Sequence, residues 1–315
     1  MKNELIQAID NISVNINPAG MHAINIILAF VMFGVALGIR PKVFIDVFRK
    51  PKSAILGIIS QLVLLPALTF VLAIVMKDHV SPMMALGMIL VASCPGGNIS
   101  NFISSLSKAN IELSVTLTAL STAGAIFTTP LNFAFWGNLY LKYTNVRQGT
   151  LPELSIPFWE VFETIVILLG IPLALGILCS HYLPKLAEKL KKPLQYCSVA
   201  FFIVMIALAL GQNIDAFGKC IKYIFLVVFI HNLLALMTGY VTGTVFRAPW
   251  KDRRTLTIET GIQNSGLGLV LLFNPLIFGD FPPHGGMLVI TAWWGIWHIV
   301  SGLVTAFIFN KSKHA

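Results

Sequence analysis

Apolar residues come in runs of about twenty along the chain, and short stretches between the runs hold most charged residues, prolines and glycines. A helix of about twenty residues crosses the hydrocarbon core of a bilayer, so each run predicts a membrane-spanning helix. Dividing the chain at its polar breaks predicts about nine of them. Their approximate ranges are 22–39, 54–76, 83–106, 112–136, 159–180, 195–213, 222–246, 255–278 and 286–309. We therefore expect an all-α polytopic membrane protein.

The composition supports this assignment, because 56% of the 315 residues are hydrophobic and only 11% are charged. An average soluble protein carries about a quarter charged residues, so a soluble globular protein is excluded. The formal net charge is +9, but the basic residues lie between the apolar runs rather than in one patch. We expect a lipid bilayer around the chain, and neither a nucleic acid nor a protein partner is implied.

The distribution of Lys and Arg predicts the orientation. Of the 22 such residues, 16 fall in loops on one side of the expected bilayer and 6 on the other. Positive residues in short loops are retained in the cytoplasm, which predicts an outside N-terminus and a cytoplasmic C-terminus. We expect an outer segment at 1–21, one transmembrane domain at 22–310 and a cytoplasmic tail at 311–315. The first twenty residues lack the apolar core of a signal peptide, so no cleavage is expected. The short loops favour a bacterial inner membrane.

The four cysteines lie in or beside apolar segments and form no CxxC pair; they are Cys94, Cys179, Cys197 and Cys220. We expect buried free thiols rather than disulfides or metal ligands.

Two of the predicted spans are interrupted midway. Pro95, Gly96 and Gly97 break the third span, and the stretch 259–266 breaks the eighth. Either break alone is compatible with a packing kink, since Gly and Pro are common in membrane helices. Irregular backbone at membrane depth, however, is tolerated only inside protein or beside a polar cavity. Gly96 and Gly261 are 165 positions apart, about half the chain. Paired interruptions indicate an inverted-repeat transporter, here with repeats at about 22–136 and 159–309.

Glu259 is the only acidic residue deep inside a predicted span. A lone carboxylate in hydrocarbon costs several kcal/mol, and no Lys or Arg lies at a matching depth. Its partner is therefore a bound cation or a proton. Oxygen atoms in the two breaks favour a hard cation, although a protonated Glu259 remains an alternative. The residues that carry these oxygens are Thr260, Gln263, Asn264, Ser100 and Asn101.

Together these segments resemble the bile acid:sodium symporter family, from about residue 22 to 310. The resemblance is carried by the strings at 93–101 (SCPGGNISN), 113–118 (LSVTLT), 121–122 (ST), 258–266 (IETGIQNSG), 297–298 (WH) and 301–302 (SG). It implies a panel domain and a core domain, with two discontinuous helices that cross in the core. It also implies Na⁺ as the coupling ion, with no other cofactor.

The resemblance further implies two sodium sites. The first comprises Ser100, Asn101, Ser114, Thr118 and Glu259. The second comprises the side chains of Gln61, Gln263 and Glu259 with the backbone carbonyls of Thr260 and Ile262. Gln61, Ser114 and Thr118 enter through the resemblance alone.

An anionic substrate is expected at the breaks, because half-helix N-termini carry partial positive charge and free N–H groups. The residues expected to meet it are Gly97, Asn98, Asn264, Ser265, His298 and Ile299. Many bacterial members of the family have Asn where this chain has Ile299, which removes a polar group from the expected crevice. We expect His231, the other deep histidine, to be a neutral hydrogen-bonded helix contact.

The expected function is sodium-coupled symport of organic anions, such as bile acids, by alternating access. One alternative is a Na⁺-coupled carrier of a smaller, pantothenate- or keto-acid-like carboxylate. Another is a proton-coupled carrier or passive channel in which Glu259 titrates. An intramembrane enzyme is not expected, because the chain has no HExxH, no GxSxG and no second intramembrane acid to pair with Glu259. Bacterial relatives often have ten spans, but the polar first twenty residues favour the nine-span form of the animal members.

Overall fold

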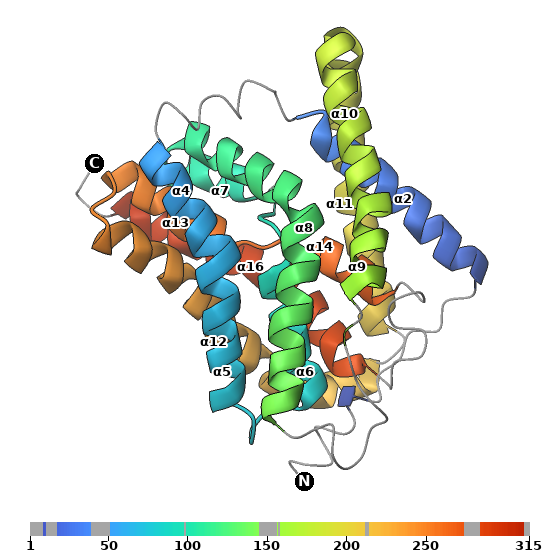
Figure 1. Cartoon of the computed structure of the whole chain (residues 1–315), viewed down its shortest axis with the longest axis vertical. Helices are drawn as coiled ribbons and strands as arrows, with labels where there is room; N and C mark the ends of the chain where they lie inside the picture. The colour runs from blue at the N-terminus through green and yellow to red at the C-terminus, as the bar shows by residue number, and fades with distance from the viewer. Residues whose placement is uncertain are drawn as a thin grey trace.

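The chain is an α-helical membrane protein (Figure 1). The computed structural model describes residues 9–10, 18–38, 51–97, 99–144, 156, 158–211, 214–273 and 284–311. Helices account for almost all of these residues, and no β-strand occurs among them.

Five apolar helices in the described ranges are long enough to cross a membrane: Pro51–Val75, Ile111–Tyr143, Phe158–Tyr182, Cys220–Val245 and Gly285–Lys311. The first comprises α4 (Pro51–Ile59), the π-helix η1 (Ser60–Leu64) and α5 (Leu65–Val75). The third comprises α9 (Phe158–Ile165), η3 (Val166–Gly170) and α10 (Ile171–Tyr182). The others are α8 (Ile111–Tyr143), α16 (Gly285–Lys311) and most of α12 (Ile214–Val245).

The remaining predicted spans also coincide with helices. Two of these are continuous, α2 (Pro18–Ala36) and α11 (Pro184–Gly211). The other two are split, as the sequence predicted. One consists of α6 (Pro82–Ser93) and α7 (Ile99–Leu106), and the other of α13 (Trp250–Gly261) and α14 (Ser265–Leu272).

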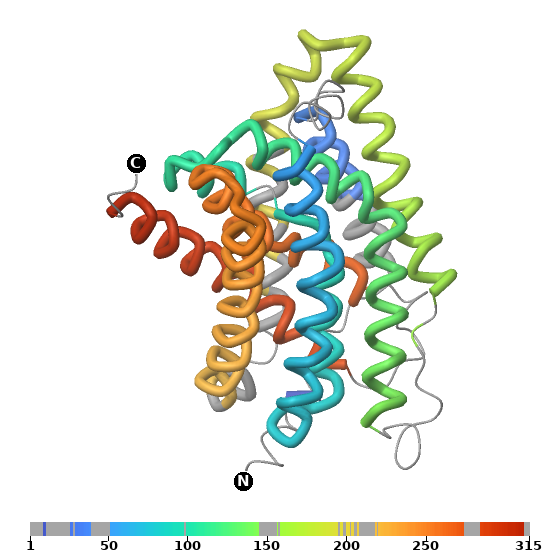
Figure 2. Tube along the Cα trace, turned by 60° about the vertical axis from the view of Figure 1, so that its left-hand side comes forward, coloured from blue at the N-terminus to red at the C-terminus, as the bar shows by residue number. Residues whose placement is uncertain are grey.

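The helices form two groups on either side of α8. One group contains α2, which packs mainly against α10 and α11. In the other, α12 packs against α13 and α5, and α16 packs against α6 (Figures 1 and 2). The split helices lie inside this second group.

Two of the four half-helices, α6 and α14, are enclosed by protein. All residues from Met83 to Ser93 of α6 and from Ser265 to Leu272 of α14 are buried. Large apolar side chains of the outer helices are instead exposed, among them Val75, Phe127 and Leu175. Lipid tails can cover such side chains, whereas irregular backbone must be satisfied by protein, so the arrangement suits a bilayer.

The π-helix η1 sets the position of Gln61, which is 1% exposed. Pro66 follows directly in the first turn of α5 and has no N–H to donate to a carbonyl of the preceding turn. Asn132 of α8 supplies the missing donor, since its Nδ2 donates to the carbonyl oxygen of Leu62 at 2.9 Å. A wide helical turn is thus held against α8, and Gln61 points into the protein.

All four cysteines are free thiols, as predicted. Cys94 and Cys220 are buried, and Cys179 is half-buried. The prediction of a buried thiol is wrong for Cys197, which is exposed. Its apolar surroundings in the sequence lie on an outer helix, α11, rather than in the protein interior.

Candidate ion and substrate site

The two helix breaks meet and pair through their backbones. Gly96 and Gln263 form an isolated antiparallel β-bridge. Beside it, the N–H of Gly97 donates to Ile262 O at 2.9 Å, and the N–H of Asn264 donates to Pro95 O at 2.8 Å. Backbone groups freed by the breaks are therefore satisfied by the opposite break. Four helix ends converge at this crossing.

The converging ends carry opposite partial charges. α6 and α13 present their C-terminal, partially negative ends to the crossing, whereas α7 and α14 present their N-terminal, partially positive ends. The side chain of Asn264 caps α14, because its Oδ1 accepts the N–H of Leu267 at 3.1 Å. One small region can thus stabilise both a cation and an anion.

The carboxylate of Glu259 lies beside the crossing and is 1% exposed. Three hydroxyl groups donate to it. Ser100 Oγ lies 2.6 Å from Oε1, Thr118 Oγ1 lies 3.1 Å from Oε2, and Ser114 Oγ also donates to Oε1. Asn101 Oδ1 lies 3.0 Å from Ser114 Oγ, which brings a further oxygen into the group. We call Glu259, Ser100, Asn101, Ser114 and Thr118 the carboxylate cluster.

A second polar group lies at the C-terminal end of α13. Gln61 Nε2 donates to the carbonyl of Glu259 at 2.8 Å, and Gln263 Nε2 donates to the carbonyl of Thr260 at 2.9 Å. Ser60 Oγ and Thr260 Oγ1 are 2.9 Å apart. Within the described part of the chain, the amide oxygens of Gln61 and Gln263 are buried and accept no hydrogen bond. Such oxygens are costly unless a donor or a cation satisfies them.

Gly96 connects the two polar groups. A Cβ at this position would lie 2.8 Å from Gln61 Nε2 and 3.2 Å from Glu259 Oε2. Its N–H donates to Ser121 Oγ at 3.2 Å. Only glycine therefore leaves space for both side chains to approach the backbone of the break.

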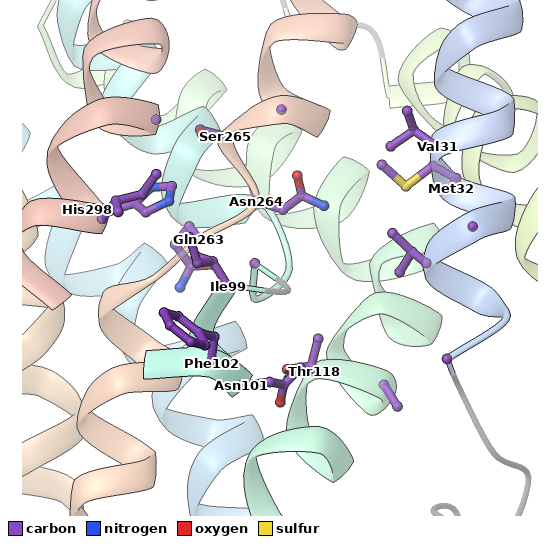
Figure 3. Close-up of a pocket in the computed structure, with 18 of the residues that line it drawn as sticks. Val31, Met32, Ile99, Asn101, Phe102, Thr118, Gln263, Asn264, Ser265 and His298 are labelled. Carbon is purple, nitrogen blue, oxygen red and sulfur yellow. Dashed lines mark hydrogen bonds between the residues drawn. The ribbon is translucent and has the colours of Figure 1, made fainter. Parts of the chain in front are cut away.

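A cavity of about 660 Å³ opens beside the crossing (Figure 3). Asn264 and Ser265 reach it from the start of α14, His298 from α16, and Val31 and Met32 from α2. Its volume falls within the range of small-molecule sites, about 300–1,000 Å³. Asn101 and Thr118 of the carboxylate cluster also line the cavity, as does Gln263. The polar cluster and the cavity therefore share side chains.

Comparison with known proteins identifies the family. Residues 25–220 match the model of the Sodium Bile acid symporter family. The chain belongs to this family. It is 30% identical over 291 residues to a protein of Bacillus subtilis (strain 168) named "Uncharacterized sodium-dependent transporter YocS", an alignment covering 91% of this chain and 83% of the relative.

Relatives in other organisms carry similar names. A "Sodium-dependent organic anion transporter" of Rattus norvegicus is 28% identical over 85% of this chain and 72% of its own. A "Probable sodium/metabolite cotransporter BASS2, chloroplastic" of Oryza sativa subsp. japonica is 30% identical over 79% of this chain and 57% of its own. Membership of the symporter family and these relatives indicate a sodium-dependent transporter in a membrane.

The structure brings most of the predicted site residues together. All five residues expected at the first sodium site belong to the carboxylate cluster. Gln61, Gln263 and the carbonyl of Thr260 lie in the second group, but Ile262 O accepts the Gly97 N–H, so one of its lone pairs is occupied. Of the residues expected at the substrate, Gly97, Asn264, Ser265, His298 and Ile299 line the cavity, whereas Asn98 lies outside the described residues.

His231 is a buried helix contact, as predicted. Its Nε2 lies 2.9 Å from Thr69 Oγ1, and its ring packs on Trp294 with centroids 4.6 Å apart. It does not line the cavity.

Four further residues at the site did not emerge as candidates from the sequence. Ser60 directly precedes Gln61, and Ser121 lies in the string at 121–122, so their positions were a usable signal. Asn232, next to His231, donates through Nδ2 to Gly261 O at 2.8 Å. Lys191, which in the sequence resembles its neighbours Lys189 and Lys192, lines the cavity. No sequence pattern distinguishes the last two residues.

Proposed function

We propose that the chain is a symporter that couples Na⁺ entry to uptake of an organic anion by alternating access. The observation that carries the proposal is the sharing of Asn101, Thr118 and Gln263 between the polar groups around Glu259 and the wall of the cavity. A cation that binds the polar groups fixes the side chains that an organic ligand meets. Occupation of one site then changes the affinity of the other, which is what coupling requires.

Two features favour Na⁺ over a proton as the coupling ion. The carboxylate cluster offers one carboxylate, three hydroxyl oxygens and one amide oxygen, a set suited to a hard cation. The unpartnered amide oxygens of Gln61 and Gln263 lie beside α13, whose C-terminal carbonyls are further acceptors. A proton on Glu259 would leave these two amide oxygens unsatisfied, whereas a second Na⁺ beside them would not. We therefore assign one Na⁺ to each group.

The architecture proposed for this function is nine spans arranged as an inverted repeat. Supporting this, α6 and α13 each have 12 residues, and α7 and α14 each have 8. The repeats would comprise about 22–136 and 159–309. In this scheme α2, α10 and α11 belong to a panel domain that moves against a core domain holding the split helices.

The proposed substrate is an amphipathic organic anion such as a bile acid. The N-terminal ends of α7 and α14 face the cavity and favour a carboxylate or sulfonate. Apolar side chains of α2 and α16, among them Val31, Met32 and Ile299, would contact the body of the molecule. A smaller carboxylate would fill less of this apolar wall.

Charge balance supports coupling to the membrane potential. Two Na⁺ ions at Glu259 leave one net positive charge, which a monovalent anion beside the crossing would neutralise. Because Glu259 stays in the protein, the two Na⁺ ions and the monovalent anion that cross the membrane would carry one net positive charge inward in each cycle. Each 100 mV of potential contributes about 2.3 kcal/mol per charge moved.

The test is uptake of radiolabelled taurocholate into proteoliposomes under an inward Na⁺ gradient, compared with K⁺. We expect uptake that requires Na⁺ and that is lost in Glu259→Ala. Glu112→Ala is the matched control, because Glu112 is exposed in the first turn of α8. If uptake in K⁺ equals uptake in Na⁺ and follows a pH gradient instead, the coupling ion is a proton rather than Na⁺.

A binding measurement separates the ion from the substrate. Na⁺ should raise the melting temperature of the purified wild type relative to K⁺, and Glu259→Ala should abolish this rise, because a ligand that binds only the native state stabilises it. A Na⁺ effect without taurocholate uptake would reject bile acids as cargo. Absence of any Na⁺ effect would reject the sodium sites.

A further inference from the structure

Lys191 occupies an unusual position for a loop-proximal lysine. It lies in the third turn of α11, where α11 packs against the C-terminal part of α2. A Cβ at Gly34 would lie 2.8 Å from Leu194 Cβ, so the two helices are in close contact there. Just beyond the C-terminal end of α2, the side chain of Lys191 extends across Gly38. A Cβ at Gly38 would lie 3.4 Å from Lys191 Cε and 3.7 Å from Nζ.

This packing places Lys191 in the cavity wall. Lys191 is the one formally charged side chain among the described residues that line the cavity. Neighbouring charged residues of α11, Glu188, Lys189 and Lys192, do not line it. Across the described residues, no hydrogen bond or ion pair connects Lys191 to an acidic side chain.

Lys191 also belongs to the part of the cavity wall that is nearest the basic loops. The wall includes the last turn of α2, early turns of α8 and α11, and the start of α7. These are helix segments near the loops that carry most of the Lys and Arg residues. With the proposed orientation, this part of the cavity wall, which includes Lys191, lies on the cytoplasmic side.

We propose that Lys191 is a specificity-determining residue, the cation that selects organic anions at the cytoplasmic opening of the cavity. A fixed positive charge beside a low-dielectric cavity raises the local concentration of anions and lowers that of cations. Lys191 acts before the ligand reaches the crossing, so it changes apparent affinity at the cytoplasmic face rather than the rate of the conformational step. The inference rests on the proposed function for the identity of the ligand as an organic anion, and on the proposed orientation for the side of the membrane on which Lys191 lies.

The charge is measurable without knowing the substrate. A reporter cysteine, Val35→Cys, lies in the cavity wall on α2, in a chain whose four free cysteines are replaced by serine. It is treated with an anionic and a cationic methanethiosulfonate, one sulfonate and one trimethylammonium reagent. The ratio of the two reaction rates reports the local potential, because any change in thiolate fraction affects both rates equally.

Lys191→Gln should lower the anion-to-cation rate ratio about fivefold or more at low salt, and less at high salt, where the Debye length is short. Lys191→Arg should preserve the ratio. Lys192→Gln is the matched control, because it removes the same charge one residue away from the cavity wall, and it should leave the ratio nearly unchanged. The proposal would be overturned if Lys191→Gln and its parent had the same rate ratio. It would also be overturned if Lys192→Gln lowered the rate ratio as much as Lys191→Gln does. Val115→Cys on α8 is the second reporter if Val35→Cys does not fold.

Transport supplies the second readout. In inside-out vesicles, Lys191→Gln should raise the half-saturating taurocholate concentration several-fold at the cytoplasmic face, with an unchanged maximal rate. If Lys191→Gln changes the rate ratio but leaves the half-saturating taurocholate concentration of active protein unchanged, Lys191 does not select the anion. The proposed symport would then still stand. A wild type without Na⁺-dependent uptake would refute the symport proposal, while the rate ratio would still test the charge of the cavity.

Discussion

Asn232 supports the end of α13 from the neighbouring helix α12. Its Nδ2 donates to Gly261 O, the last carbonyl of α13 before the break, and both residues are buried. The carbonyls at this end have no partner within their own helix. A single amide therefore fixes the backbone that also presents the carbonyl of Thr260 to Gln263.

Replacing Asn232 by leucine should destabilise the protein and weaken Na⁺ binding. The Gly261 carbonyl loses its donor in a buried site, which costs about 1–3 kcal/mol. We expect a lower melting temperature and a higher half-saturating Na⁺ concentration for thermal stabilisation.

The control for Asn232→Leu is Thr238→Val on the same helix. Thr238 Oγ1 donates only to the carbonyl of Leu234, one turn earlier in α12. This change should leave Na⁺ affinity unaltered. Equal Na⁺ affinity in wild type and Asn232→Leu would contradict a positioning role for Asn232.

At the scale of elements, the two breaks were predictable and their pairing was not. Pro95 lacks an N–H and is followed by two glycines, so an interruption follows from local chemistry alone. The bridge between Gly96 and Gln263 joins segments far apart in the chain, and no local pattern encodes such a contact. Glu259 and Ser100 were identified because polar groups at membrane depth are exceptional.

The position of Gln61 at the site could not be predicted from the residues alone. It lies on a π-helix whose freed carbonyl, that of Leu62, is satisfied by Asn132 of α8. Nothing near Gln61 in the sequence separates it from an ordinary polar residue that packs between helices. Only the resemblance to the family predicted a role for Gln61, and the tertiary contact with the Glu259 carbonyl brings its side chain to the end of α13.

The close approach at the break predicts that Gly96→Ala loses Na⁺-dependent stabilisation and uptake. The added methyl group would lie 2.8 Å from Gln61 Nε2, so either that side chain or the bridge must move. Gly124→Ala in α8 is the control, because its nearest neighbour would be Leu62 Cδ1 at 3.9 Å. We expect Gly124→Ala to retain both properties and to gain up to about 1 kcal/mol in helix propensity. Similar Na⁺ responses in the two variants would contradict the packing argument.

The N-termini of α6 and α16 share one acidic neighbour, Asp10. Its Oδ1 accepts a hydrogen bond from Ser81 Oγ at 2.6 Å, and a Cβ at Gly286 would collide with its carboxylate. Burial raises the pKa of Asp10 to about 6, against the lowering effect of the Ser81 hydrogen bond.

This pKa shift predicts that the free energy of unfolding falls as the pH rises from about 4 to about 6. In that window the native state retains a proton that the unfolded chain has lost, so raising the pH favours unfolding. The melting temperature should fall by roughly a few degrees, since 1 kcal/mol corresponds to about 2–4 °C in a chain of 150–250 residues and to less in a longer chain of 315. Asp10→Asn should flatten the profile over this range. A wild-type melting temperature that rises with pH here would contradict the raised pKa.

At the scale of the whole molecule, orientation connects the charge pattern to the cavity. Sixteen of the 22 basic residues lie on the predicted cytoplasmic side, and the cavity wall includes turns of α2, α8 and α11 that adjoin loops of that side. The proposed roles of Lys191 and of the Na⁺ gradient both depend on this orientation. In the opposite orientation the cavity would open outward, and Lys191 would select anions before uptake rather than at release.

Single reporter cysteines in a chain with its native cysteines replaced test the orientation directly. Lys77 and Lys185 are both exposed, and they lie on opposite predicted sides. A membrane-impermeant maleimide added to intact cells should label Lys77→Cys, and it should label Lys185→Cys only after permeabilisation. Positive-inside retention acts on short loops such as these, which is why two sites suffice. Labelling of Lys185→Cys in intact cells, with Lys77→Cys protected, would reverse the topology and require the direction of coupling to be reassigned.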